Sequence, residues 1–487
     1  MKLPSRRRGA LLALPLIAML GAAVAQAQDN IVPIEVRQRH DGDVNMGFVD
    51  VTVCNAARQC RTVPDVLVDT GSSGLRLFRG ALDGLQLDAV RDAEGRMLAN
   101  ASSFGLGGLW GTLHLAQVGL GKVTTSGAIP IQLYDHPWPL ERLPAEYRKV
   151  DARSSFVAMS NGILGISPRR SHAYGYYAFS AAGGDASDSD WVPVAVDATR
   201  ELANPIGHFP APYDNGSVIK MPKVDWHGGH KQLLGWLGLG IGQPTEALFP
   251  QSKRRIAHEL DESGLFAAKL GGRRIDVLVD CGTTGVVLDL EHLDLERLGV
   301  TSPHGQERLY DAAPLTPLAL TVSSGGRDIE LARPLYVGPL ADALKKASGG
   351  YGVLPALVAK RASEAAPQVL GMPFFYGRTV ATGLAGTVNP FAQGRAVNSK
   401  PVAAAPLGGP LGVHIIDDHV DRLMSIEDDE DDEDIEIIND EVQIGGGTKL
   451  IDDYVKPAQA PAPVVEDDPV AYSVSPNGYI VYTDSSL

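Results

Sequence analysis

The sequence predicts an all-β protein, mainly β with short helices, built from two similar lobes. Three observations favour this class. The chain has 487 residues, which is more than a single hydrophobic core usually accommodates. Its 54 glycines and 33 prolines suit a fold with many turns. A segment of the first half recurs in the second half, which is typical of duplicated architectures.

Strand patterns support the β prediction. The segments from Phe48 to Val53 and from Val66 to Val68 are apolar or alternate in polarity. Two glycine-rich segments, Gly105 to Gly111 and Gly238 to Gly242, resemble phosphate-binding loops. A dinucleotide loop must open a helix, whereas residues 112–119 alternate like a strand. We therefore expect β turns and sheet edges at both places.

The first 27 residues have the pattern of a cleavable secretory signal. Basic residues (Lys2, Arg6, Arg7 and Arg8) precede an apolar run from Ala10 to Val24, and small residues stand at Ala25 and Ala27. A membrane anchor is the weaker alternative because the run is short for a bilayer. No later segment is apolar enough to span one. We expect an exported chain, periplasmic or extracellular, without a transmembrane anchor.

The cysteines predict one disulfide and no metal site. Cys54 and Cys60 flank a polar turn, and in an oxidising compartment they can bridge a hairpin; two free thiols are the alternative. Cys281 is left unpaired. No Cys-x-x-Cys pair is present, and the two histidines of the His227 to His230 segment lack further ligands nearby, so we interpret this segment as a surface turn.

Four regions are expected along the chain: a signal peptide at 1–27, an N-terminal lobe at 28–210, a C-terminal lobe at 211–400 and an acidic, largely disordered tail at 414–487. Residues 180–190, which are small and polar, are expected to form a surface loop.

The tail carries the acidity of the protein. The net charge is −15, and from His414 onward there are 20 acids against 3 bases. This balance gives no argument for nucleic acid binding and makes a basic partner the candidate for the tail. The eight consecutive acids from Glu427 to Asp434 lack the spaced ligands of a calcium loop, which leaves calcium binding as a weaker alternative.

The internal repeat is the strongest signal. Asp65 to Leu77 aligns without gaps with Asp276 to Leu288, with eight of thirteen positions identical and two Ser/Thr exchanges. An apolar-glycine marker follows each copy, so that Leu164 lies 95 residues after Asp69 and Leu370 lies 90 residues after Asp280. Each copy leads an apolar strand into an aspartate on a tight turn. Similar spacing in the two halves predicts two similar lobes.

Two aspartates presented in this way can perform acid and base chemistry together. Neighbouring carboxyl groups cannot both ionise at low cost, so Asp69 and Asp280 are expected to share one proton and to titrate as a pair. The ionised member can take a proton from water while the other donates to the carbonyl oxygen of a substrate. This chemistry needs no cofactor and no metal.

These residues and their order resemble the pepsin-like aspartic peptidases over about Phe48 to Arg378. The chain is also similar to bacterial envelope proteins of that fold, which share the cysteine hairpin before the first aspartate loop. The resemblance implies a bilobal fold with a pseudo-twofold axis, in which Asp69 and Asp280 are catalytic and Ser72 and Thr283 hold their outer oxygens. The other supporting residues implied are Thr70, Gly71, Cys281 and Gly282.

Three features depart from that family. Cys281 replaces a threonine whose hydroxyl reaches across to the other loop, and a thiol is a weak donor. Phe104 occupies the best match to a tyrosine on the hairpin that covers the site; Trp110 can partly replace the missing hydroxyl or can simply pack in its strand. The short stretch between the signal and Phe48 leaves no room for a long inhibitory prosegment.

The sequence therefore predicts an exported aspartic endopeptidase that hydrolyses peptide or protein substrates. The alternative is a catalytically weak or inactive protein of the same fold that binds peptides or envelope partners. A third class, an inhibitor or a structural assembly factor, would use the acidic tail to bind its partner.

Overall fold

The computed structural model describes most of the chain between Asp29 and Ala385, together with three short strands beyond it. The predicted signal peptide, residues 181–189 of the predicted surface loop and most of the predicted tail lie outside the described residues. The described ranges are 29–39, 43–104, 107–134, 142–144, 160–180, 190–226, 229–249, 256–259, 265–293, 298–301, 309–324, 327–331, 333–361, 367–385, 412–417, 472–474 and 480–482.

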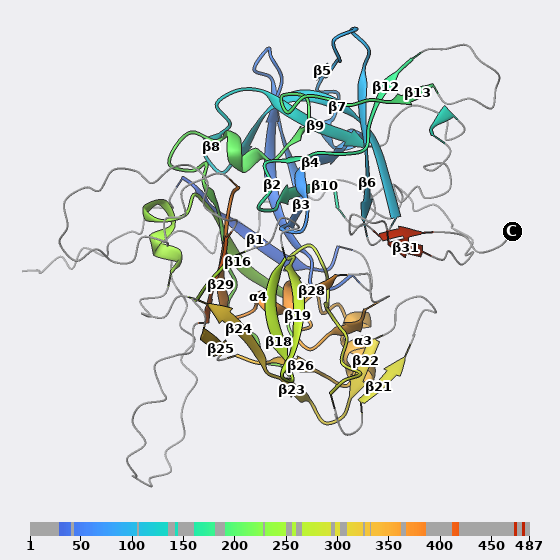
Figure 1. Cartoon of the computed structure of the whole chain (residues 1–487). Coiled ribbons are helices and arrows are strands. Elements are labelled where there is room, and N and C mark those ends of the chain that lie inside the picture. Colours follow the sequence, from blue (N-terminus) through green and yellow to red (C-terminus); the bar gives the residue numbers. More distant parts are fainter. Residues whose placement is uncertain are drawn as a thin grey trace, which may run out of the picture. The chain divides into compact units, whose positions relative to one another are not determined.

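The prediction of a mainly β fold with short helices is confirmed (Figure 1). Strands up to residue 239 are β1 (Ile31–Arg37), β2 (Gly47–Cys54), β3 (Cys60–Asp69), β4 (Ser73–Phe78), β5 (Asp88–Ala89), β6 (Leu98–Phe104), β7 (Gly107–Leu120), β8 (Val123–Thr124), β9 (Ile129–Tyr134), β10 (Gly162–Ile166), β11 (Ser171–His172), β12 (Tyr176–Phe179), β13 (Trp191–Pro193), β14 (Leu202–Ala203), β15 (Gly216–Lys220) and β16 (Gln232–Leu239).

Later strands are β17 (Ile256–Glu259), β18 (Phe266–Leu270), β19 (Arg273–Val279), β20 (Val286–Leu288), β21 (Leu298–Thr301), β22 (Leu309–Ala312), β23 (Thr316–Leu318), β24 (Leu320–Ser324), β25 (Arg327–Glu330), β26 (Leu335–Val337), β27 (Val358–Lys360), β28 (Gln368–Leu370), β29 (Arg378–Gly383), β30 (Gly412–Asp417), β31 (Tyr472–Val474) and β32 (Ile480–Tyr482). The helices of the described residues are short: α3 (Leu340–Ser348), α4 (Met372–Phe375) and the 3-10 turns η1 (Arg79–Leu82), η3 (Pro205–His208) and η4 (Gln243–Leu248).

The end of strand β3, from Val66 to Val68, lies in the first repeat and is buried on both faces. Val66 and Val68 belong to the main core, whereas Leu67 packs with Met46 and Phe48 in a separate cluster. A strand covered on both sides needs a continuous apolar run rather than an alternating one, which explains the Val-Leu-Val sequence. Burying each such side chain contributes about 1.5–3 kcal/mol.

The apolar-glycine markers lie beside the repeats. In the first half β10 pairs parallel with β3, so that Gly165 lies opposite Asp69, and antiparallel with β4. In the second half β28 pairs parallel with β19, so that Leu370 lies opposite Val279, and antiparallel with β20. The two halves therefore repeat one strand arrangement, with β20, β28 and β19 as neighbours in a nine-stranded sheet.

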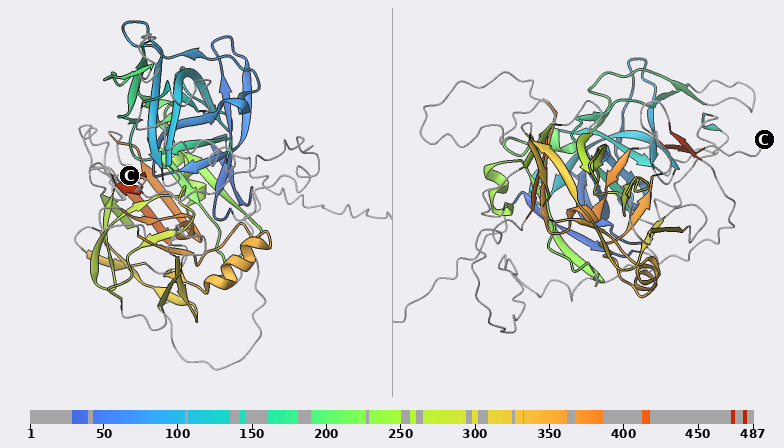
Figure 2. Two further views of the ribbon diagram at one scale, coloured as in Figure 1. Left: turned by 90° about the vertical axis from the view of Figure 1, so that its right-hand side faces the viewer. Right: turned by 60° about the horizontal axis from the view of Figure 1, so that its bottom comes forward.

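Strands from distant parts of the chain form one continuous set of antiparallel pairs. Strand β1 pairs with β16 and β2, β16 with β15, and β15 with β29. Strand β29 pairs in turn with β30, which belongs to the predicted tail, and β30 pairs with β17. Figures 1 and 2 show this set as blue, green and brown strands. Strands β1, β16, β29 and β30, from distant parts of the described chain, thus share one sheet.

A disulfide closes the hairpin between β2 and β3. Cys54 and Cys60 are paired residues of the two strands and are joined, as predicted, while Cys281 is buried and free. The turn between them is held by Asn55, whose amide oxygen accepts from the Gln59 backbone at 2.9 Å. Among the described residues no helix is long and apolar enough to cross a membrane.

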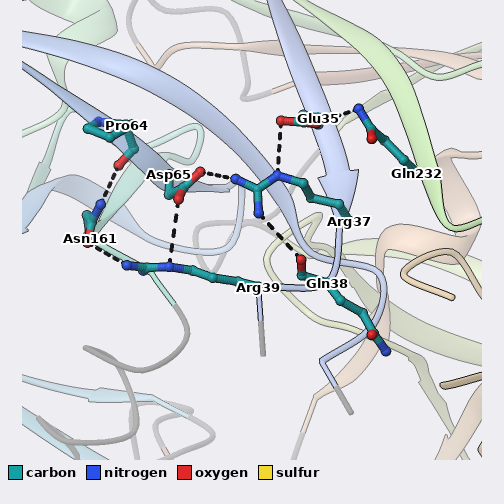
Figure 3. A network of polar contacts seen from close by, with 8 residues as sticks. All are labelled: Glu35, Arg37, Gln38, Arg39, Pro64, Asp65, Asn161 and Gln232. Carbon is teal, nitrogen blue, oxygen red and sulfur yellow. Dashed lines mark hydrogen bonds and ion pairs between the residues drawn. The ribbon is translucent and has the colours of Figure 1, made fainter. Parts of the chain in front are cut away.

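A polar network surrounds Asp65, four residues before Asp69 (Figure 3). Arg37 donates to the Asp65 carboxylate, and the Arg39 guanidinium lies 3.7 Å from it. Arg39 also donates to Asn161 at 2.7 Å, and Asn161 donates to the Pro64 carbonyl at 2.9 Å. This network joins the end of β1 to the strand that leads to Asp69.

Candidate active site

Asp69 and Asp280 end equivalent strands and are held in equivalent loops. Asp69 is the last residue of β3, and Asp280 directly follows β19. The Asp69 Oδ1 atom accepts from the backbone of Gly71 at 2.7 Å, and the Asp280 Oδ1 atom accepts from Gly282 at 2.8 Å. Hydrogen bonds to the residue two positions ahead fix each carboxylate on its own turn.

The outer oxygens are held by the two hydroxyl residues expected to do so. Ser72 donates from its hydroxyl to Asp69 Oδ2, and Thr283 donates to Asp280 Oδ2 at 2.6 Å. The Ser72 backbone makes an additional bond to Asp69 Oδ1 at 3.1 Å. Both carboxylates are therefore oriented by side-chain and backbone donors.

The loops also hold one another. Thr70 donates from its hydroxyl to the Val279 carbonyl at 3.0 Å and accepts from the Cys281 backbone, also at 3.0 Å. In the opposite direction the Cys281 thiol donates to the Val68 carbonyl, with an S···O distance of 3.2 Å. The thiol thus occupies the position of the expected hydroxyl. Each loop donates one side-chain hydrogen bond to a backbone carbonyl of the strand that leads to the other loop.

Gly71 and Gly282 allow the carboxyl groups to meet. A Cβ atom added to Gly71 would lie 2.6 Å from Asp280 Cγ, and one added to Gly282 would lie 3.1 Å from Asp69 Cγ. Each glycine therefore faces the carboxyl group of the opposite loop. We call these two carboxyl groups, each of which faces the glycine of the opposite loop, the Asp pair.

Burial and mutual repulsion keep a proton on the Asp pair. Removal from water, and secondly the negative charge of Asp69, raise the pKa of Asp280 to about 8, although the Thr283 hydroxyl acts in the opposite direction. The proton belongs to the coupled pair. Burial also raises the pKa of the Cys281 thiol, which therefore stays protonated and can act as a donor.

The two residues considered for the covering hairpin lie in different surroundings. Phe104 ends β6, is partly buried, and packs with Leu109, Tyr134 and Ile163. Trp110 in β7 is 2% exposed and packs against the rings of Tyr177 and Trp191. The structure therefore places Phe104 in an apolar cluster with Leu109, Tyr134 and Ile163, and Trp110 within an aromatic cluster of the same half.

Arg76 is a residue of this region that the sequence interpretation missed. It is fully buried on β4, and its guanidinium donates to the carbonyls of Ser73 at 3.0 Å and Gly74 at 3.3 Å and to the Ser102 hydroxyl at 3.0 Å. It also lies 5.2 Å from the Phe104 ring centre. A signal was available, because an arginine interrupts the apolar strand where the second copy of the repeat has Val287.

Other candidate features lie elsewhere. His230 pairs by its backbone with Val353, while His227 lies outside the described residues. A cavity of about 290 Å³ opens beside β19, and neither member of the Asp pair lines it. Its charged lining residues are Arg273, Arg274, Asp276, Asp289, His292 and Arg361.

Comparison with known proteins gives the family of the chain. The model of the family described as "Protein of unknown function (DUF3443)" matches residues 26–398, and the chain belongs to this family. No curated protein matches the sequence.

Among solved structures, the crystal structure of an aspartic proteinase from Irpex lacteus is similar, with 15% sequence identity and a TM-score of 0.41. The match covers 72% of this chain and 93% of that chain. A similarity at this level says nothing about activity. The pepsin-like fold is carried instead by the repeated strands, the two aspartate loops and their reciprocal hydrogen bonds.

Proposed function

We propose that the protein is an exported aspartic endopeptidase that hydrolyses peptide bonds of peptide or protein substrates. The observation that carries this proposal is the Asp pair itself. Two carboxyl groups from matched loops each lie against the glycine of the opposite loop, and burial and the charge of Asp69 raise the pKa of Asp280 to about 8. That arrangement supplies an acid and a base at one point.

The chemistry follows from the protonation of the pair. Asp69 takes a proton from a water molecule whose oxygen attacks the peptide carbonyl carbon. Asp280 donates its proton to the carbonyl oxygen, giving a tetrahedral diol. When the diol collapses, Asp69 gives its proton to the leaving nitrogen as the C–N bond breaks, and a diol hydroxyl returns a proton to Asp280. The pair ends as it began.

The loops support this cycle by keeping both carboxyl groups in place while the proton moves. Ser72 and Thr283 hold the outer oxygens, and Thr70 and Cys281 tie each loop to the other. Groups held before the reaction need little reorganisation during it.

Export is proposed from two independent features. Residues 1–27 have the composition of a secretory signal. The Cys54–Cys60 disulfide is of a kind that persists in oxidising compartments outside the cytoplasm. We place the active protein in the periplasm or outside the cell.

The proposal is tested by incubating the purified protein with a peptide library between pH 3 and pH 7. We expect cleavage by the wild type and loss of about 10³-fold or more in Asp69→Asn and Asp280→Asn. Asp276→Asn is the matched control, because Asp276 is a half-exposed residue of the strand that leads to Asp280. Equal background cleavage by all four proteins would exclude the peptidase function.

A binding protein of the same fold is the second candidate, favoured by Phe104 and Cys281 in place of better hydrogen-bond donors. It is distinguished by a peptide that carries a hydroxymethylene group in place of the scissile amide. Binding of this peptide without turnover of the library would support the second candidate over the first.

A further inference from the structure

Asn45 is a fully buried polar residue in the connection between β1 and β2. Its side chain has no exposed surface, and its backbone has a φ of 56°, a left-handed conformation that asparagine tolerates better than most residues. Its backbone N–H donates to the Gly352 carbonyl at 2.7 Å. A residue from the first tenth of the chain is thus held within the second half.

The side-chain amide of Asn45 uses its full hydrogen-bonding capacity. The Nδ2 atom donates to the carbonyls of Thr284 at 2.7 Å and Leu354 at 2.8 Å. The Oδ1 atom accepts from the Leu354 backbone at 2.7 Å and from the Tyr376 hydroxyl at 2.8 Å. An amide offers two donors and two lone pairs, so a fully satisfied one has a single orientation.

One of these bonds reaches the second aspartate loop. Thr284 follows Thr283, whose hydroxyl holds Asp280 Oδ2. Fixing the Thr284 carbonyl therefore limits the movement of Thr283 and, through it, of the Asp280 carboxyl group. The aspartate itself makes no contact with Asn45 in this scheme.

The end of β1 and the residues that follow it also make contacts within the first half of the chain. Arg37 and Arg39 contact Asp65, at the start of the strand segment that leads to Asp69 (Figure 3). Gln38, which lies between these two arginines in the sequence, donates to the Ala347 carbonyl at 2.8 Å in the second half. The segment from Arg37 to Met46 therefore connects the strand of one aspartate with the loop of the other.

We propose that Asn45 is a positioning residue for the Asp pair, which holds the Asp280 loop in register with the Asp69 loop from outside both repeats. The inference rests on the proposed function for its catalytic consequence, but the positioning itself can be measured without activity. The titratable groups that face Asp280 are Asp69 from the first loop and Cys281 from its own loop.

The test follows the titration of Asp280 by carbon-13 NMR of protein labelled at the aspartate carboxyl carbons, with the Asp280 signal assigned by its loss in Asp280→Asn. In Asn45→Ala we expect the loop to loosen and admit water, so that the Asp280 titration moves to lower pH by about half a unit or more. Tyr376→Phe removes one bond to Asn45 and is expected to give a smaller shift in the same direction.

Asn30→Ala is the matched control. Asn30 is also buried and donates from its amide to two carbonyls, those of Leu239 and Pro244, both at 2.9 Å. Its loss is expected to lower stability while leaving the Asp280 titration unchanged. An unchanged titration in Asn45→Ala, or an equal shift in Asn30→Ala, would overturn the inference.

If Asn45→Ala does not fold, Asn45→Ser and Tyr376→Phe decide the question by the same criterion. Where the wild type cleaves peptides, kcat is expected to fall more than KM changes in the Asn45 variants, since substrate contacts are not removed. A wild type without activity would exclude the proposed function alone, because the NMR titration would still test the positioning of Asp280.

Discussion

The two aspartate loops reach the same backbone geometry with different side chains. Both hold Oδ1 through a glycine N–H and Oδ2 through a hydroxyl, but Ser72 serves one loop and Thr283 the other. Thr70 donates a hydrogen bond from its hydroxyl to Val279, and Cys281 donates one from its thiol to Val68. Strands and glycines therefore determine the positions of the carboxyl groups, whereas the flanking side chains determine how firmly each carboxyl group is held.

The surroundings of the loops differ more than the loops do. Beyond the first loop, Arg76 binds two loop carbonyls and the Ser102 hydroxyl of β6. At the matching position beyond the second loop stands Val287. The second loop is instead held through Asn45, from a distant part of the chain. Each loop therefore depends on its own external support.

The largest expected effect comes from the glycine that lies closest to the opposite carboxyl group. In Gly71→Ala the new Cβ would approach Asp280 Cγ to 2.6 Å, so the carboxyl groups must separate, and we expect peptidase activity to fall by about 10²-fold or more. Gly282→Ala, with a closest approach to Asp69 Cγ of 3.1 Å, is expected to lose less. Initial rates of peptide cleavage measure both.

Gly127→Ala is the control for these variants, since a Cβ added there meets no atom within 4 Å. Equal activities of Gly71→Ala and Gly127→Ala would contradict the close approach of the two loops.

Replacing Arg76 tests the support of the first loop. Arg76→Met removes hydrogen bonds to three buried acceptors, and we expect the free energy of unfolding to fall by about 2–3 kcal/mol in urea. The control Arg274→Met changes a side chain that is 73% exposed and should stay within about 0.5 kcal/mol of the wild type. Similar losses in both variants would argue against a supporting role for Arg76.

The proton on the Asp pair predicts a pH dependence of stability. The folded pKa of Asp280, about 8, is raised above the unfolded value of an aspartate, so the folded state binds more protons between about pH 4 and pH 8. Asp280 therefore contributes stability at low pH that is lost as the pH rises toward 8, at up to about 1.4 kcal/mol per pH unit.

Urea unfolding of the wild type and of Asp280→Asn at pH 5 and pH 7 measures this contribution. The variant is expected to lose less stability than the wild type between the two values. If the slopes of the two proteins agree, Asp280 does not hold a proton in the folded state.

The smallest effects are expected from the two residues that join the loops. Thr70→Ala removes a donor to Val279 and an acceptor for Cys281, which we expect to cost about 2 kcal/mol in the free energy of unfolding. Cys281→Ala removes the single thiol bond to Val68 and is expected to cost about 1 kcal/mol. Cys281→Thr should recover this loss, and its failure to do so would show that the thiol bond adds no stability.

Local sequence was sufficient for the parts of the site that lie within a few residues of each aspartate. The repeat indicated Asp69 and Asp280, and the resemblance to pepsin-like peptidases implied the roles of Ser72 and Thr283, whose hydrogen bonds span only three positions. The apolar-glycine markers, which follow each copy at similar distance, pair in parallel with both strands. The hairpin disulfide followed from spacing in the same way.

The role of Asn45 could not be predicted from the local sequence. Its partners Thr284, Leu354 and Tyr376 are 239, 309 and 331 residues away, and no local pattern distinguishes it from a turn asparagine on the surface. The pairing of β30 with β29 was similarly hidden, because the composition around residue 414 predicted only a change to an acidic tail.

The sequence by itself determined the β class, the duplication and the two aspartate loops, since these depend on apolar patterning and on short-range hydrogen bonds. Only the tertiary structure decided that each glycine faces the carboxyl group of the opposite loop, that a thiol bonds across the loops, and that Asn45 supports the second loop. The physical reason is that both features depend on contacts between residues far apart in the sequence. Burial and a neighbouring carboxylate keep a proton on the Asp pair, and distant partners satisfy every hydrogen bond of the buried Asn45 amide, so no single segment encodes either feature.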